Sequence, residues 1–108
     1  MQLPSGLAAE LAGTVVEVQP DGERWLILQV LAPGLAERQV TAAESAADTT
    51  ALCETWGSRE AAETADPPDQ IVVQMMSEPV ERGEAAPGVR QFFAGYRYQD
   101  GACIWEDF

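Results

Sequence analysis

The segment VRQFFAGYRYQDGACIWEDF, residues 89–108, is the part of this sequence that most clearly predicts a fold. Asp100-Gly101 is a preferred two-residue turn of a β-hairpin. Pairing outward from this turn sets Tyr96 opposite Trp105, and side chains then alternate between two faces. We expect one face to carry Phe92, Tyr96, Tyr98, Cys103 and Trp105, and the other to carry Phe93, Ile104 and Phe108.

A second hairpin is predicted near the start of the chain, over residues 14–33. Val16 and Val18 alternate with polar residues, which is the two-residue period of a β-strand. Pro-Asp-Gly at positions 20–22 is a strong turn signal. The returning strand, residues 25–31, is apolar on both faces. We therefore expect it to be a central strand, or one that is covered on each side.

Residues 41–63 have the pattern of a helix. Thr41 and Glu44 fit a capping box, in which each side chain bonds the backbone of the other residue. Small or apolar residues recur at steps of three and four, which predicts the buried face of the helix. That stripe comprises Ala42, Ala46, Thr49, Cys53 and Trp56, whereas the acids Glu44, Asp48, Glu54, Glu60 and Glu63 mostly lie off it. Gly57 is expected to stop or kink the helix.

The remaining segments complete the expected architecture. Residues 70–76, QIVVQMM, form a short apolar strand, and residues 80–88 form a polar loop. The start of the chain fits a short helix capped by Ser5 about as well as an extended edge segment. Together, these predicted strands and the helix form a single α+β domain over residues 1–108, in the order ββαβββ. Its mostly antiparallel sheet of about five strands packs on one main helix.

The charge balance restricts the partners of the protein. The chain has 18 acidic residues against six arginines, and it contains no lysine or histidine, for a net charge of -12. We expect no direct binding of nucleic acid, because a phosphate backbone requires a basic surface. Scattered acids usually form a solvated surface, but they also suit a protein that imitates nucleic acid or binds a basic partner. No apolar run is long enough to span a membrane.

Several kinds of chemistry are excluded by the residue types. Without histidine and lysine, no Ser-His, Cys-His or Ser-Lys nucleophile can be assembled. Two cysteines in one chain cannot supply a four-cysteine or mixed Cys-His zinc site, and no glycine-rich phosphate loop of standard spacing is present. We expect no catalytic residues, metal or cofactor. A carboxyl pair, Asp66 with Asp69 or Glu106 with Asp107, is the remaining catalytic candidate, although 18 acids place some pairs together by chance.

The two cysteines are the more informative pair. Cys53 lies on the buried stripe of the expected helix, and Cys103 lies on the aromatic face of the last hairpin. If that face packs on the helix, the two can form a disulfide worth about 4 kcal/mol. Such a bond indicates an oxidising compartment. The alternative is a pair of buried free thiols.

Several aromatic residues are candidates for a contact surface, although such residues more often belong to a core. The candidates are Trp25, Tyr96, Tyr98, Trp105 and Phe108. On the other face of the last hairpin, Arg97 is expected to pair with Glu17 or Glu106 at the surface. We expect little stabilisation from that pair.

Residues 50–108 resemble a family of small alphaproteobacterial, rhodobacter-type proteins of unknown function. The resemblance lies in LCETWG at 52–57, in PPDQ and the strand that follows, in QFF at 91–93 and in CIWEDF at 103–108. It implies an exported protein. It also implies that both cysteines belong to the family pattern, which favours the disulfide. It implies no activity and no catalytic residues.

Two functional hypotheses follow. The first is a non-enzymatic protein-binding or accessory domain, periplasmic or secreted and stabilised by its disulfide. The second is a cytoplasmic acidic inhibitor that mimics nucleic acid and blocks a basic protein surface. The salt dependence of binding distinguishes the two hypotheses. The mimic should bind its basic partner much more weakly as ionic strength rises, because salt screens the attraction between opposite charges.

Overall fold

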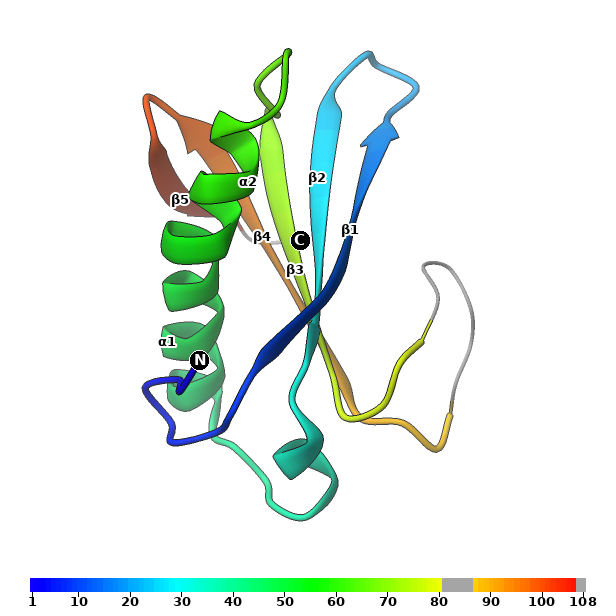
Figure 1. The fold of residues 1–108 in the computed structure, drawn as a ribbon, viewed down its shortest axis with the longest axis vertical. Helices are drawn as coiled ribbons and strands as arrows, with labels where there is room; N and C mark the ends of the chain where they lie inside the picture. Colours follow the sequence, from blue (N-terminus) through cyan, green and yellow to red (C-terminus); the bar gives the residue numbers. More distant parts are fainter. Residues whose placement is uncertain (81–86, 107–108) are drawn as a thin grey trace.

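A five-stranded sheet with one helical layer forms the fold of this protein (Figure 1). The computed structural model describes residues 1–80 and 87–106. The strands are β1 (Glu10–Val18), β2 (Arg24–Leu31), β3 (Gln70–Met76), β4 (Gln91–Gln99) and β5 (Ala102–Glu106), and they lie in that order across the sheet. Only β2 and β3 are parallel. The predicted α+β class and the mostly antiparallel sheet are confirmed.

The helical layer connects the two parallel strands. It consists of the short 3-10 helix η1 (Pro33–Ala36), α1 (Ala42–Leu52), the π-helical turn η2 (Cys53–Gly57) and α2 (Ser58–Ala62). The predicted capping box at Thr41 is present. Gly57 does not end the helix, because the chain passes through it in a π-helical turn. A Cβ atom at Gly57 would lie 3.2 Å from Ile71 Cγ2, so glycine allows the helix to approach β3 closely.

Both predicted hairpins are formed. In the last one Tyr98 pairs with Cys103 and Tyr96 with Trp105, around a turn in which Asp100 and Gly101 have φ values of 51° and 78°. The two expected faces are therefore confirmed for their members up to Glu106. Phe108, and residues 81–86 of the expected loop, lie outside the described residues.

The first nine residues are neither a helix nor a strand of the sheet. Gly6 has a φ of 94° and makes a turn that lets Gln2 bridge Ala8. Leu3 and Leu7 are buried in the core. The segment is thus an ordered loop that lies against α1 at Asp48. Over residues 1–9 it is neither the short helix nor the extended edge segment that the sequence suggested.

The core lies between the helical layer and the sheet. Its buried members on the sheet are Leu26, Leu28, Val30, Ile71, Val73, Met75, Ala94 and Tyr96, and those on the helices are Leu35, Leu52, Cys53 and Ala61. Ile27 and Val72, on the opposite face of the sheet, are also buried, as expected for central strands. Among the described residues, no helix combines the length and apolar character needed to cross a bilayer.

Candidate functional site

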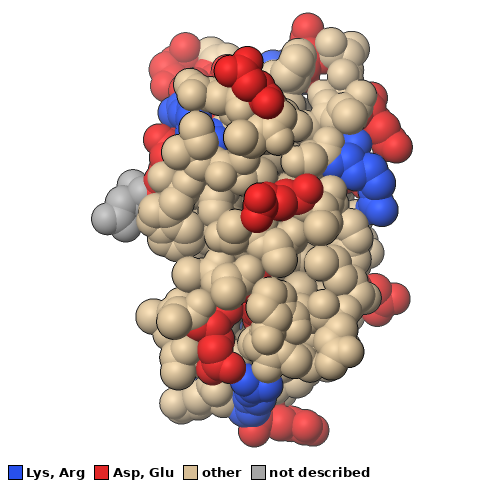
Figure 2. Space-filling model, turned by 90° about the vertical axis from the view of Figure 1, so that its left-hand side faces the viewer, with Lys and Arg blue, Asp and Glu red and all other residues tan. Residues whose placement is uncertain are grey.

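Acidic side chains are dispersed over the face of the molecule that carries α1. Figure 2 shows them separated by uncharged surface, with basic side chains in only a few places. Large apolar side chains are exposed on β1, where Val16 and Val18 are 48% and 63% exposed, and on the last two strands. Trp105, Phe93 and Ile104 are 52%, 49% and 47% exposed, and all three belong to β4 and β5. The last two strands therefore carry exposed apolar side chains on both faces, with Trp105 on the face of α1 and with Phe93 and Ile104 on the opposite face.

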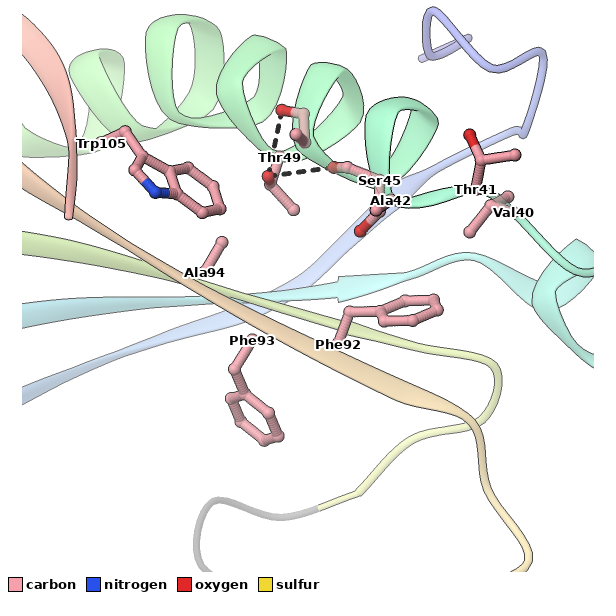
Figure 3. A pocket seen from close by; sticks show the side chains of 10 residues that line it. Val40, Thr41, Ala42, Ser45, Thr49, Phe92, Phe93, Ala94 and Trp105 are labelled. Carbon is pink, nitrogen blue, oxygen red and sulfur yellow. Dashed lines mark hydrogen bonds between the residues drawn. The ribbon is translucent and has the colours of Figure 1, made fainter. Parts of the chain in front are cut away.

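Next to these residues lies a groove between α1 and β4, with a volume of about 570 Å³. Phe92, Ala94 and Trp105 point into the space below the helix, whereas Phe93 points to the other side of the sheet (Figure 3). The described residues that line the groove include no charged one. They are Val40, Thr41, Ala42, Ser45, Ala46, Thr49, Phe92, Phe93, Ala94 and Trp105. An uncharged, mostly apolar hollow of this size is typical of a binding site.

The groove exists because the two halves of the helical layer carry side chains of different size. Leu52 and Cys53, in the second half, are buried against the sheet. The first half presents Ala42, Ser45 and Ala46 to β4. These small side chains leave the space above Phe92 and Ala94 unfilled.

Hydrogen bonds and ring contacts hold the walls of the groove together. The Tyr96 hydroxyl lies 2.8 Å from Thr49 Oγ1 and 2.9 Å from Thr50 Oγ1. Thr49 also donates to the Ser45 carbonyl oxygen, so β4 is fixed to the middle of α1. The Trp105 ring meets the Tyr96 ring edge to face, with centroids 5.5 Å apart. This contact with Tyr96 of β4 holds Trp105 in place as one wall of the groove.

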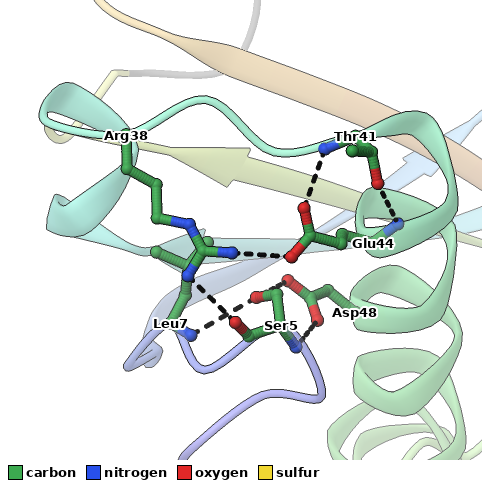
Figure 4. A network of polar contacts seen from close by, with 6 residues as sticks. All are labelled: Ser5, Leu7, Arg38, Thr41, Glu44 and Asp48. Atoms are coloured by element: carbon green, nitrogen blue, oxygen red, sulfur yellow. Dashed lines mark hydrogen bonds and ion pairs between the residues drawn. The ribbon is translucent and has the colours of Figure 1, made fainter.

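The start of α1 is held by a polar network (Figure 4). Asp48 accepts bonds from the backbone N–H of Ser5 at 2.9 Å and from its hydroxyl at 2.5 Å. Arg38 donates to the Ser5 carbonyl oxygen and pairs with Glu44 at 2.6 Å. Glu44 accepts from the Thr41 backbone N–H, and this bond, with the Arg38 charge as a weaker cause, lowers the pKa of Glu44.

A disulfide joins the helical layer to the last strand, as expected. Cys53 of η2 and Cys103 of β5 are bonded, and their sequence separation is 50 residues. Cys53 is fully buried, whereas Cys103 is partly exposed. The bond fixes β5 to the helix two residues before Trp105.

The structure does not bring the predicted aromatic contact residues together on one surface. Tyr96 is buried in the core, and Tyr98 is half-buried against it. Trp25 lies on the opposite face of the sheet, because it pairs with Glu17 and alternates with the core residue Leu26. Of the four aromatic candidates that the structure describes, only Trp105 lines the groove. Phe108 lies outside the described residues.

Two of the four candidate carboxyl groups, those of Asp69 and Glu106, take part in structural contacts. Asp69 accepts a bond from the Arg24 backbone N–H, and Glu106 contacts Gln70 and Arg97. Arg97 thus pairs with one of its two expected partners, and it also pairs with Glu23 at 2.7 Å. Asp66 is exposed, and Asp107 lies outside the described residues.

The contact between Arg97 and Glu23 predicts a stability that depends on pH. The Arg97 hydrogen bond, followed by that from Trp25, lowers the pKa of Glu23 from its ordinary value of 4.5. The contribution of Glu23 is therefore present above the unfolded pKa and is lost as the pH falls through the folded one. We expect Glu23→Gln to reduce the loss of stability between about pH 5 and pH 3.

Urea unfolding midpoints at several pH values measure this effect. Protonation of the other acids relieves repulsion in the folded chain, so only the difference between wild type and variant is informative. Glu54→Gln, at an exposed position of η2, is the control and should follow the wild type. Identical curves for Glu23→Gln and wild type would contradict the prediction.

The groove was not predicted from the sequence. The stripe of small residues containing Ala42 and Ala46 was assigned to the buried face of the helix, and Phe92 to the aromatic face of the hairpin. Phe92 does lie on that face. Ala42 and Ala46 line the groove beside β4, but Ala42 is exposed and Ala46 is only partly buried, so the prediction of burial is wrong for Ala42. The combination of small residues on α1 with an exposed Trp105 opposite them is the signal that could have indicated a space between the two elements.

Comparison with known protein families finds a match over the whole chain. The full chain, residues 1–108, matches a family of unknown function, DUF6497. The match extends beyond the resemblance noted over residues 50–108. No curated protein and no solved structure matches the chain.

Proposed function

The chain belongs to the DUF6497 family of unknown function, and we propose that it is a non-enzymatic protein-binding domain. Its site is the groove between α1 and β4. The occupant is an extended apolar segment of a partner protein that carries flanking basic residues. The observation that carries this proposal is an uncharged hollow of about 570 Å³ beside the half-exposed Trp105.

The edge of β4 supports an extended occupant. In the described part of the chain, β5 pairs with β4 only from Gly95 to Gln99. The preceding residues of β4 pair with β3 alone, and three of them line the groove. A segment that adds to a sheet edge gains backbone hydrogen bonds and places alternate side chains into an adjacent pocket. The groove and this edge together suit such a segment better than a compact ligand.

Charge supports a basic partner. A net charge of -12 on 108 residues attracts cationic proteins over long distances and accelerates their association. The groove itself is uncharged, so we assign affinity to apolar contacts and steering to the surrounding acids. Mimicry of nucleic acid, the second hypothesis, would place the affinity in the acids instead. The dispersed acids on the face in Figure 2 do not favour it.

The disulfide supports an exported protein, since such bonds persist in oxidising compartments. We place the domain in the periplasm or outside the cell, and we retain the alphaproteobacterial origin that the resemblance implies. The contacts made by Asp69 and Glu106 support a role without catalysis, because both carboxyl groups already bond the protein itself.

A peptide selection tests the proposed function. Displayed random peptides of about ten residues are selected on the oxidised protein. Their affinities are then compared for Ala46→Phe, which fills the groove, and Ala47→Phe, on the exposed side of the same helix. We expect apolar sequences with basic flanks that bind Ala46→Phe about tenfold more weakly and Ala47→Phe unchanged. Peptide affinity measured on a chain that ends at Glu106 shows whether residues 107–108 compete with the peptide for the groove.

Two outcomes would overturn the proposal. Selected peptides that bind Ala46→Phe as tightly as wild type would place the site elsewhere. Peptides rich in arginine and lysine but without apolar residues, whose binding disappears at high salt, would favour mimicry of nucleic acid.

A further inference from the structure

We propose that the Cys53–Cys103 disulfide completes the groove, so that only the oxidised chain binds its partner. This inference rests on the proposed function and names its regulation. The bond then acts as a condition for binding in addition to stabilising the fold.

The position of β5 makes this strand dependent on the bond. It is the last strand of the sheet, and in the described part of the chain it pairs with β4 alone. None of its five residues is fully buried. The buried core residues come from the other elements, so β5 can leave the sheet without taking any of them with it.

Trp105 connects β5 to the groove. It lies on the same face of the strand as Cys103 and forms one wall. Tyr96, against which it packs, belongs to β4 and is held separately by Thr49 and Thr50 of α1. Release of β5 therefore removes Trp105 from the groove while Tyr96 stays in place.

The chemistry is a thiol–disulfide exchange with a protein disulfide as the oxidant. The partly exposed Cys103 attacks one sulfur of the oxidant as a thiolate, which forms a mixed disulfide and releases the first thiol. Cys53 then displaces the second thiol and forms the intramolecular bond. Two protein thiols lose two electrons and two protons in total, and the oxidant becomes two thiols. Binding would then begin only where such an oxidant is present.

The test compares oxidised wild type, wild type held reduced with a phosphine, and Cys103→Ala. Nile red, a neutral apolar dye, probes the groove, and hydrogen exchange reports the protection of β5 separately from β2 and β3. We expect the reduced protein and Cys103→Ala to bind the dye about tenfold more weakly than the oxidised protein. Exchange should accelerate most in β5, which then opens locally, whereas β2 and β3 should stay protected and lose only the global free energy of unfolding that the bond supplies.

Three outcomes would overturn this inference. They are equal dye binding by the oxidised and reduced forms, equal protection of β5 in both, and protection of β5 that stays as high as that of β2 and β3 after reduction, since β5 would then open only with the whole fold. Failure of the proposed function has a different signature. In that case Ala46→Phe and wild type, both oxidised, bind the dye equally, whatever reduction does to β5.

Discussion

Reduction of the Cys53–Cys103 bond is expected to lower the free energy of unfolding by about 4 kcal/mol. The bond joins residues 50 positions apart, and a loop of that length restricts the unfolded chain by about that amount. At about 5 °C per kcal/mol for a domain of this size, the melting temperature should fall by about 20 °C. Thermal unfolding followed by circular dichroism, with and without a phosphine reductant, measures the change.

The reduced wild type is the proper comparison, because it keeps both sulfur atoms in place. A variant with alanine at both positions also loses the packing of the fully buried Cys53 and should be somewhat less stable. Domains of this size are commonly stable by about 5–15 kcal/mol, so the reduced chain should still be folded at room temperature. A melting temperature within about 2 °C of the oxidised value would show that the bond contributes little.

The parts of the fold that were predicted correctly are those determined by neighbouring residues. Asp100-Gly101 determines a turn, and the register of the hairpin follows from it by counting, so the pairing of Tyr96 with Trp105 required no knowledge of the rest of the chain. Thr41 and Glu44 determine the start of α1 in the same way. Local signals of this kind are strong because the groups involved are at most a few residues apart.

The features that were missed depend on contacts between distant segments. The groove results from the distance between α1 and β4, which no local pattern contains. The five aromatic residues were grouped by type, but the sheet places Trp25 on its other face and Tyr96 in the core. Asp48 lay off the predicted buried stripe, yet it is fully buried, because the first nine residues cover that side of the helix. The stripe alone could not reveal this second covering layer.

Replacement of Asp48 by alanine should consequently lower the free energy of unfolding far more than replacement of other acids in the helix. Asp48 accepts two bonds from Ser5, and its loss leaves the Ser5 backbone N–H without that acceptor in a partly buried place. We expect the free energy of unfolding to fall by about 3 kcal/mol, since a buried polar group that loses a charged partner is costly. Ser5→Ala, which removes only the hydroxyl bond, should cost about 1 kcal/mol.

Urea unfolding of Asp48→Ala, Ser5→Ala and the control Glu54→Ala measures these costs. Glu54 is exposed, so its replacement should change stability by less than about 0.5 kcal/mol. The first nine residues should also become accessible to protease in Asp48→Ala, because Leu3 and Leu7 depend on the same loop for their burial. If Asp48→Ala is as stable as Glu54→Ala, the apolar contacts of Leu3 and Leu7 hold the segment, and the network in Figure 4 contributes little to its stability.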